Sequence, residues 1–384
     1  MSDMEKIVSA FAAEGKIESI TPLGNGLIND TFKVKTEGDS PDYVLQRINN
    51  SIFGDVALLQ HNIEAVTGHI RRKLELAGEK DIDRKVLRFV PARQTSEDGR
   101  SRTYVEADGK FWRLSVFIPD SYTYNTVNAE YSYYAGKAFG NFEAMLSDMP
   151  DELGETIPDF HNMELRLSQL IEAVEKDPVC RIDEPDDEPG RCRKENDPDH
   201  SDELLALLED IDTYGVDMCR AEQLHRDGIL PKRICHCDTK VNNMLFDRDG
   251  NVLCVIDLDT VMPSFVFSDY GDFLRTAACT APEDEPDTSK ISFNMEIFKA
   301  FTKGYLESAG GFLTDVEKEN LPYAACMFPF MQAVRFLADY INGDTYYRAA
   351  YIDHNFVRAR AQMTLFHSAL SHKEEMAEYI RSLS

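Results

Sequence analysis

The sequence predicts an α+β fold with two lobes, a small β-rich N-lobe at residues 1–118 and a larger, mostly helical C-lobe at residues 119–384. Three observations support this prediction. Short apolar segments separated by turn-forming residues dominate up to residue 118. Apolar residues at helical spacing dominate after Pro119. The chain has 384 residues, which is long enough for two lobes that each bury a core.

Four segments of the N-lobe have the pattern of strands. IESITPL, LINDTFKVKT and DYVLQRIN are short, rich in β-branched and aromatic residues, and bounded by turn residues. The fourth, FWRLSVFI, alternates and places four apolar residues on one face: Trp112, Leu114, Val116 and Ile118. These segments predict a sheet as the framework of the N-lobe.

Helical spacing occurs once in the N-lobe and repeatedly in the C-lobe. Between Val56 and Leu74 apolar residues recur every three or four positions, and Gly78 is the expected stop. In the C-lobe we predict helices over 128–147, 163–176, 202–227, 291–308, 315–341 and 354–370. Thr314 and Glu317 have the spacing of a capping box at the start of the fifth.

An acidic segment interrupts the helical C-lobe at residues 177–203. It contains eleven acidic residues and four prolines. Such a composition offers too little apolar surface to build a core, so we expect a solvated insert between two helices. The sequence does not predict the role of this insert.

The composition of the whole chain excludes some partners. The formal net charge is −27, and this field repels nucleic acid and anionic membranes. The N-terminus has no signal-peptide pattern, and no apolar run approaches the roughly 20 residues of a membrane helix. Eight cysteines show no disulfide-framework spacing, so we expect a cytoplasmic protein. The sequence does not predict the oligomeric state.

The stretch HCDTKVNNMLFD at residues 236–247 places polar side chains beside an apolar segment. A turn sequence, RDGN, follows it, and then VLCVIDLD, a short apolar strand that ends in carboxylates. A hairpin would therefore bring the end of HCDTKVNN close to Asp257 and Asp259. Oxygen ligands from both sides suit Mg²⁺, while Asp238 remains to accept a proton from a hydroxyl. The combination predicts a phosphoryl-transfer site.

Spacing within this stretch assigns individual roles. The protein-kinase catalytic loop has the pattern H-R-D-L-x-x-x-N, and the H, D and final N occur here at the same offsets. Asp238 is then the catalytic base, and Asn243, not Asn242, is a metal ligand together with Asp257. Lys240 either contacts the transferred phosphoryl group as a catalytic residue or is a solvated surface lysine.

The chain resembles the aminoglycoside phosphotransferase and choline kinase superfamily, and within it the N-acetylhexosamine 1-kinase group. The resemblance is carried by GNGLINDTF at 24–32, VLQRIN at 44–49, HCDTKVNNMLFD at 236–247, VIDLDTVMP at 255–263, DYGDFLR at 269–275, RFLADYINGDTYY at 335–347 and HNFVRARAQ at 354–362. It covers most of the chain apart from the acidic insert. It implies a protein-kinase-like two-lobe fold, ATP and Mg²⁺ as cofactors, and a small-molecule sugar substrate.

Two N-lobe segments are candidates for nucleotide binding. Gly24, Asn25 and Gly26 lie between two predicted strands, where a kinase glycine-rich loop lies, and their backbone can approach phosphates closely. The same glycines would also suit an ordinary hairpin turn. Phe117 and Ile118 lie where the two lobes meet, and we expect their backbone groups to face adenine.

Arg47 is the predicted phosphate anchor. It lies in the strand YVLQRIN, which occupies the position of the phosphate-pairing lysine of protein kinases and contains no lysine. Similar kinases of the choline type also use arginine there, and the guanidinium suits phosphate. An acidic partner on the following helix would be Glu64 or absent, because helical periodicity does not choose between Glu64 and Asn62 as the inward residue.

The C-lobe supplies further candidates. By resemblance, Arg335 and Tyr346 face the sugar, the arginine through hydrogen bonds and the tyrosine through stacking. Asp259 is either a second metal ligand or an acceptor for loop amides. Asp269 and Asp272 support the catalytic loop in the resembling enzymes, and we expect the same structural role here.

The leading functional hypothesis is an ATP- and Mg²⁺-dependent sugar kinase that phosphorylates the anomeric hydroxyl of an N-acetylhexosamine, GlcNAc or GalNAc, to the 1-phosphate. The alternatives are a kinase of another small alcohol, such as choline, an aminoglycoside or another sugar, or a metal-dependent phosphohydrolase. A hydrolase needs no nucleotide-binding lobe, so ATP binding separates these classes. A catalytically inactive binding protein would not need Asp238, Asn243 and Asp257 together.

Overall fold

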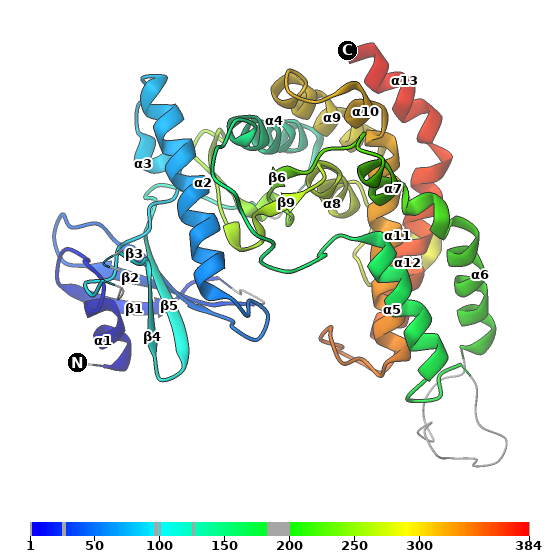
Figure 1. The fold of residues 1–384 in the computed structure, drawn as a ribbon, viewed down its shortest axis with the longest axis horizontal. Helices are drawn as coiled ribbons and strands as arrows, with labels where there is room; N and C mark the ends of the chain where they lie inside the picture. The colour runs from blue at the N-terminus through cyan, green and yellow to red at the C-terminus, as the bar shows by residue number, and fades with distance from the viewer. Residues whose placement is uncertain are drawn as a thin grey trace. The chain divides into compact units, whose positions relative to one another are not determined.

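The structure is a computed structural model that describes residues 2–24, 28–95, 99, 101–124, 127–182 and 200–383 (Figure 1). They form two compact units. The first unit comprises Met1–Tyr124, Phe142–Pro158 and Asn242–Pro263, and the second comprises Asn125–Asn141, Asp159–Val241 and Ser264–Ser384. These units group the hairpin region after residue 242 with the N-terminal part of the chain. The functional lobe boundary near residue 118 remains a prediction.

A five-stranded antiparallel sheet is the framework of the first unit. Its strands are β1 (Ile17–Pro22), β2 (Asp30–Thr36), β3 (Tyr43–Ile48), β4 (Tyr104–Ala107) and β5 (Lys110–Val116). They are arranged in the order β1-β2-β3-β5-β4. All four predicted strands are present, and β4 is a further strand that pairs with β5. Short helix α1 (Asp3–Ser9) packs its Val8 into the core on one face of the sheet.

The two faces of the sheet carry different side chains. Arg47 and Trp112 are cross-strand partners, and so are the neighbouring Gln46 and Arg113. Because successive side chains alternate, these two pairs point to opposite faces. Trp112 lies in the apolar core that includes α1. Arg113 instead faces helix α2 (Val56–Leu76), where it donates a hydrogen bond of 3.4 Å to Gln60.

Helix α2 confirms the predicted amphipathic helix of the N-lobe. Asp55 caps its first turn by accepting a hydrogen bond from the backbone N–H of Leu58, 2.9 Å long. The apolar stripe is buried, with Leu59 and Ile63 fully inaccessible to solvent. The helix ends just before Gly78, whose φ of +68° is the left-handed conformation that glycine adopts at helix ends. A one-turn helix, α3 (Ile82–Lys85), follows.

The predicted hairpin after the HCDTKVNN stretch is present in the first unit. Strands β7 (Met244–Phe246) and β8 (Val252–Val255) pair in antiparallel register. The turn between them is closed by Asp247, whose carboxylate accepts hydrogen bonds from the backbone and side chain of Asn251, 2.8 and 2.9 Å long. The 3₁₀ turn η2 (Leu258–Thr260) and short strand β9 (Met262–Ser264) follow. Ahead of the hairpin lie β6 (Arg233–Cys235) and η1 (Val241–Asn243).

Helices make up most of the second unit. They are α5 (Met163–Lys176), α6 (Ser201–Met218), α7 (Arg220–Arg226), α8 (Phe267–Ala277), η3 (Thr288–Lys290), α9 (Met295–Ala309), α10 (Asp315–Glu319), α11 (Leu321–Ile341), α12 (His354–Ser371) and α13 (Lys373–Leu383). Helix α4 (Ala129–Leu146) begins in the second unit and ends in the first. Each predicted helical range contains helix, while α8 and α13 are additional.

Two predicted long helices are each broken into two. The range 202–227 divides at Cys219 into α6 and α7, and the range 315–341 divides at Asn320 into α10 and α11. The second break has a physical cause, because Pro322 lies in the first turn of α11 and its ring disfavours continuation from a preceding helix. The capping box of Thr314 and Glu317 is confirmed at the start of α10.

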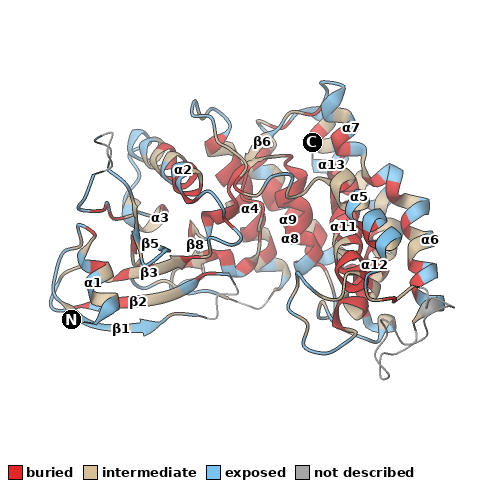
Figure 2. Cartoon of the chain, turned by 60° about the horizontal axis from the view of Figure 1, so that its bottom comes forward, coloured by how far each residue is buried: buried red, intermediate tan, exposed pale blue. Residues whose placement is uncertain are grey.

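Helix α11 is the centre of the second unit and is buried along almost its whole length (Figure 2). It packs against α5, α8, α12 and α13. Helix α8 approaches it closely at Gly271, where an added Cβ would lie 2.4 Å from Phe328 and 2.6 Å from the carbonyl oxygen of Ala324. Only glycine allows this approach. The position of α8 matters because α8 carries Asp269 and Asp272.

Both described ends of the predicted acidic insert are packed, which corrects the expectation that residues 177–203 are solvated throughout. Arg181 stacks over Tyr340 at 4.0 Å and pairs with Asp344 at 2.8 Å. His200 stacks on Phe356 with a ring separation of 4.4 Å. Residues 183–199 lie outside the described residues. The insert is therefore shorter than the composition suggested.

The expectations about membrane helices and disulfides can be compared with the described residues. Within the described ranges, every helix is too short or too polar to cross a membrane. The described cysteines are free thiols, and Cys192 lies outside the described residues.

Candidate active site

The predicted catalytic loop, residues 236–243 after β6, is held by the first turn of α8. Asp269, which is fully buried, accepts hydrogen bonds from the backbone N–H groups of His236 and Cys237, 2.8 and 2.7 Å long. Its own carbonyl accepts a hydrogen bond from the Thr239 hydroxyl, 2.7 Å long. One helix turn on, Asp272 accepts from the backbone N–H of Thr239 at 3.1 Å. The structural role expected for both aspartates is thus observed in their contacts.

His236 and Lys240 flank the predicted base, Asp238. His236 is buried, its ring packs edge-on against Phe139 at 5.7 Å, and its Nδ1 accepts the backbone N–H of Asp238 at 3.3 Å. Lys240 Nζ lies 2.5 Å from Asp238 Oδ1. Burial lowers the pKa of Lys240, but the carboxylates of Asp238 and Asp272 outweigh this and raise it above its usual value. Lys240 is therefore ion-paired with Asp238, and its side chain is 41% exposed. Its contact with the transferred phosphoryl group stays a prediction.

Asp272 connects the catalytic loop to a buried arginine. Arg275 donates hydrogen bonds to Asp272 at 3.2 and 3.3 Å and to Glu283 at 2.7 Å. Burial raises the pKa of Asp272, while the Arg275 guanidinium opposes the rise. The loop is thus hydrogen-bonded, through Asp272, to a network of charged side chains within the second unit.

The two predicted metal ligands lie at one end of the hairpin in the first unit. The carbonyl oxygen of Asn243 accepts the backbone N–H of Ile256 at 2.9 Å, so Asn243 and Asp257 are neighbours across the hairpin. Asp257 has a φ of +61°, a left-handed conformation that aspartate tolerates better than most residues. An amide and a carboxylate are oxygen donors of the kind that Mg²⁺ prefers. The donor set therefore fits Mg²⁺, and Asn243 lies five positions after Asp238 in the chain.

Both carboxylate oxygens of Asp259 already have protein partners. Asn29 Nδ2 donates to Oδ2 at 2.6 Å, and Oδ1 is ion-paired with the guanidinium of Arg113. The aspartate is 4% exposed. Of the two alternatives for Asp259, the structure favours an acceptor role over a metal ligand. Its partners, Arg113 and Asn29, were not singled out from the sequence.

The predicted nucleotide loop is described in part. Gly24 is exposed and has a φ of +72°, which requires glycine-like freedom of the backbone. Asn25 and Gly26 lie outside the described residues. A phosphate-binding role for this loop therefore stays a prediction.

Arg47 has an acidic partner, but it does not lie on helix α2. Arg47 Nε donates to Asp30 Oδ2 at 2.6 Å, and Asp30 is its cross-strand neighbour on β2. Glu64, the helix candidate, accepts a hydrogen bond from the Thr103 hydroxyl instead. The Arg47 side chain is 40% exposed, so it remains accessible to a phosphate.

In the segment predicted to face adenine, some backbone groups are already hydrogen-bonded to other groups of the protein. The N–H of Phe117 donates to the carbonyl of Asp42 at 2.9 Å, and Lys33 Nζ lies 3.8 Å over the Phe117 ring. Ile118 is buried, and its carbonyl accepts the Ser121 hydroxyl at 2.7 Å. Adenine recognition by Phe117 and Ile118 stays a prediction.

Arg335 and Tyr346, the two predicted sugar-binding residues, both contact the ring of Tyr347 in the second unit. The Arg335 guanidinium lies 5.5 Å over Tyr347 and 5.5 Å over Phe160. The exposed Tyr346 ring meets Tyr347 edge-on at 4.8 Å. Asp339, buried on α11, holds this segment by accepting the backbone N–H groups of three successive residues: Thr345, Tyr346 and Tyr347.

A second arginine, which sequence reasoning missed, joins Arg335. Burial, with a contribution from the charge of Arg335, lowers the pKa of Arg166 to about 10. His161 lies beside both, and burial followed by the charges of Arg335, Arg166 and Arg275 holds the pKa of His161 well below its usual value. Among the described residues neither Arg166 nor Arg335 forms an ion pair. We call Arg166, Arg335 and His161 the arginine cluster.

Polar atoms in the arginine cluster lack protein partners. Arg166 donates to the carbonyl of Phe160 at 2.6 Å and to Gln169 at 2.9 Å, but its buried Nε has no hydrogen-bond partner. The same is true of the buried Nδ1 of His161. Buried polar groups are normally satisfied, so such atoms indicate a place for a polar ligand group. No local sequence pattern separates Arg166 from an ordinary helix-surface arginine.

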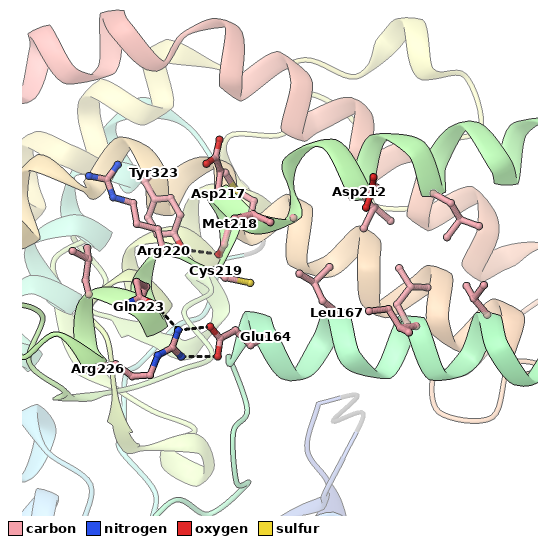
Figure 3. Close-up of a pocket in the computed structure, with 18 of the residues that line it drawn as sticks. Glu164, Leu167, Asp212, Asp217, Met218, Cys219, Arg220, Gln223, Arg226 and Tyr323 are labelled. Carbon is pink, nitrogen blue, oxygen red and sulfur yellow. Dashed lines mark hydrogen bonds and ion pairs between the residues drawn. The ribbon is translucent and has the colours of Figure 1, made fainter.

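A separate apolar pocket of about 980 Å³ lies between α5, α6 and α7 (Figure 3). Its apolar lining includes Leu167, Leu170, Ile171, Leu208, Ile211 and Met218. At its edge Arg226 forms two hydrogen bonds of 2.7 Å with Glu164. Burial raises the pKa of Cys219, which also lines the pocket, to about 12, so the thiol is not activated. None of the residues predicted to act in catalysis lines this pocket.

Comparison with solved structures supports the fold. An aminoglycoside phosphotransferase from Alicyclobacillus acidocaldarius matches with a TM-score of 0.60 and 11% identity, over 98% of this chain and 96% of that one. A Plasmodium vivax ethanolamine kinase matches with a TM-score of 0.51 and 14% identity, over 90% and 81%. A choline/ethanolamine kinase family protein from Mesorhizobium loti has a TM-score of 0.50 and 15% identity, over 97% and 99%. These matches confirm the predicted α+β, protein-kinase-like two-lobe fold.

The sequence itself matches a family model. The match extends over residues 19–294, which include the glycine loop, the catalytic loop and the hairpin with Asp257. It covers well over half of the chain. The chain therefore belongs to the phosphotransferase enzyme family.

Proposed function

We propose that the protein transfers the γ-phosphoryl group of ATP to the anomeric hydroxyl of an N-acetylhexosamine, GlcNAc or GalNAc, and produces the 1-phosphate. Family membership supports phosphoryl transfer. The acceptor is supported by the resemblance of several segments to hexosamine 1-kinases and by the charge of the arginine cluster. The arginine cluster is the observation that carries the choice of acceptor.

In this proposal each part of the active site has one role. Asp238 accepts the proton of the attacking hydroxyl. Asn243 and Asp257 hold Mg²⁺, which neutralises charge on the phosphates when bound. Lys240 exchanges its ion pair with Asp238 for the transferred phosphoryl group, and Arg47 and the loop beginning at Gly24 hold the remaining phosphates.

The arginine cluster belongs to the same unit as the catalytic loop and interacts with it electrostatically. Arg275, whose charge lowers the pKa of His161, is bonded to Asp272, and Asp272 bonds the backbone of Thr239. The charge of Arg275 thus acts on His161, and Arg275 is bonded through Asp272 to the loop that carries Asp238. This supports an acceptor site at the arginine cluster.

The charge of the cluster favours a neutral acceptor over a cationic one. Choline, ethanolamine and aminoglycosides would bring a positive charge beside Arg166 and Arg335, which no carboxylate among the described residues pairs with. At roughly 6 Å and an effective dielectric constant of about 20, each such repulsion costs on the order of 3 kcal/mol. An acetamido carbonyl instead accepts hydrogen bonds from a guanidinium. The unpartnered donors therefore match an N-acetylated sugar.

The test is an acceptor panel at fixed ATP and Mg²⁺. We expect kcat/KM for GlcNAc or GalNAc to exceed the values for glucose and galactose, because a site built to bond a polar group discriminates against its absence. Phosphorus NMR should show a sugar 1-phosphate. A 6-phosphate product, or a preference for choline or ethanolamine over every sugar, would contradict the proposal and favour a kinase of another small alcohol.

A control without acceptor separates kinase from hydrolase. If the protein releases phosphate from ATP or from simple phosphate esters at the same rate with and without sugar, it is a phosphohydrolase. We expect ATP consumption to depend on the acceptor.

A further inference from the structure

We propose that Arg113 is a positioning residue for the metal-binding turn: by holding Asp259, it fixes the turn that carries Asp257. The inference rests on the proposed function, because it concerns the Mg²⁺ ligand Asp257. Nothing in the kinase motif assigns a role to Arg113, which lies in the middle of a strand. The proposal is argued from contacts within the first unit.

Arg113 and Asp259 form a buried ion pair. The side chains are 3% and 5% exposed. Arg113 also donates from Nε to Gln46 Oε1 at 2.9 Å and from NH1 to Gln60 Oε1 at 3.4 Å. The guanidinium is thereby held by a strand and a helix, so its position is fixed before it meets Asp259. A guanidinium that is held rigidly in this way also holds the Asp259 carboxylate, and with it the turn, in one position.

Three separate anchors hold the turn at residues 257–261. The first is the Asp259 carboxylate, bound by Arg113 and Asn29. The second is the Asp259 carbonyl, which accepts the Thr156 hydroxyl at 3.0 Å. The third is the carbonyl of Val261, which accepts Asn62 Nδ2 of α2 at 2.9 Å. Of these, only the first places a charged pair two residues from Asp257.

The conformation of Asp257 explains why the turn needs such anchors. Its φ of +61° is unfavourable for a residue with a side chain and persists only where the surroundings impose it. On the other side of Asp257, the N–H of Ile256 is bonded to Asn243. Asp257 is thus held between the hairpin and the Asp259 anchor, and its carboxylate direction depends on both.

Asn29 extends the same anchor toward the predicted nucleotide loop. Its Nδ2 donates to Asp259 at 2.6 Å, and its Oδ1 accepts the backbone N–H of Asn49 at 2.9 Å. In the chain Asn29 follows the loop that begins at Gly24. One carboxylate therefore connects the end of that loop with the turn that carries the metal ligand. We therefore expect the affinities for nucleotide and for metal to fall together when this carboxylate loses its partners.

Loss of Arg113 would leave the Asp259 carboxylate buried with only Asn29 as a side-chain donor. A buried carboxylate without its cation moves toward water or another donor, and the turn moves with it. Groups behind metal ligands commonly change metal affinity by about 10-fold to 100-fold when they are replaced. We therefore expect Arg113→Met to weaken Mg²⁺-dependent nucleotide binding and not only to lower stability.

The experiment measures ADP binding by calorimetry at a series of Mg²⁺ concentrations, together with the melting temperature. Arg113→Met should raise the Mg²⁺ concentration for half-maximal binding by about 10-fold or more. Arg113→Lys keeps the charge and should recover part of the loss. Lys73→Met is the control, because it removes an ion pair away from the metal-binding turn, the 2.5 Å contact of Lys73 on α2 with Asp148, and should leave the Mg²⁺ dependence unchanged.

Each possible result either supports or overturns the inference. A lower melting temperature with an unchanged Mg²⁺ dependence would make Arg113 purely structural and overturn it. If Arg113→Met does not fold, Arg113→Lys and Asn29→Ala decide, since both should shift the Mg²⁺ dependence in the same direction. A wild-type protein that shows no Mg²⁺-dependent nucleotide binding would overturn the proposed function as well, whereas normal wild-type binding with unaffected variants overturns this inference alone.

Discussion

Lys240 Nζ lies 2.5 Å from Asp238 Oδ1, so the proposed catalytic base is paired with a lysine of its own loop. The lysine must turn from Asp238 to phosphate before it can contact the transferred phosphoryl group. The two residues are therefore expected to act as one unit. This coupling leads to the first prediction.

Lys240→Met should lower kcat by about 10-fold or more, because in this account the lysine contacts the transferred phosphoryl group. Lys290→Met, which removes an ion pair with Glu285, is the control and should leave kcat unchanged. A kcat equal to that of wild type would remove Lys240 from the catalytic site.

Asn243→Ala and Asp257→Asn should each raise the Mg²⁺ requirement and abolish most of the activity. Asparagine is chosen at position 257 because it tolerates a φ of +61°, so the backbone of the turn is preserved. Magnesium titration of the initial rate measures the effect. Asp249→Ala removes an exposed carboxylate from the same hairpin and should not change the titration midpoint. An unchanged midpoint in either test variant would remove that residue from the metal site.

Glu222→Gln should stabilise the protein near pH 8 more than near pH 5. Burial raises the pKa of Glu222 to about 7 from a usual value of 4.5, although the backbone N–H of Met163 donates to it. The stability that this group contributes is fully present below pH 4.5 and is lost as the pH rises through 7. Glutamine does not titrate, so the variant should avoid a loss of up to about 3 kcal/mol.

Thermal unfolding of both proteins across this pH range tests the prediction for Glu222. Glu172→Gln, on the exposed side of α5, is the control, because the hydrogen bond from Lys176 lowers the pKa of Glu172 and so moves its titration below the same range. A stability difference between Glu222→Gln and wild type that does not change with pH would contradict the raised pKa of Glu222.

Deletion of residues 183–199, with a short Gly/Ser bridge, should preserve folding and turnover. The deletion keeps Arg181 and His200, which are packed against the helical unit through Tyr340 and Phe356. Loop length alone changes stability slowly. A large rise in the KM for the acceptor would show that this segment takes part in substrate binding.

Elements that depend on neighbours in the chain were predictable from the sequence. Helix α2, its stop at Gly78 and the capping box of Thr314 follow from spacing over a few residues, and all are confirmed. The hairpin that carries Asp257 follows from a turn sequence between two apolar segments. The break at Cys219 was not predictable, because the helical spacing continues through it.

Contacts between distant parts of the chain were not predictable. In the sequence, Arg113 is an ordinary residue of an alternating strand. Its ion-pair partner, Asp259, lies far along the chain. Helical periodicity left open whether Glu64 is a partner of Arg47, and the register of β2 and β3 places Asp30 beside Arg47 instead. Arg166 and His161 carry no motif, and only the fold brings them to Arg335. Sequence reasoning thus found the chemical motif and missed the groups that surround it.

The most direct test of the central claim is the turnover of Asp238→Asn, measured together with its affinity for nucleotide and with acceptor present. The account predicts nearly unchanged nucleotide binding and a kcat lower by about 10² or more, the usual scale for loss of a positioned base. Activity within a few-fold of wild type would contradict the claim that Asp238 is the base of a phosphoryl-transfer reaction.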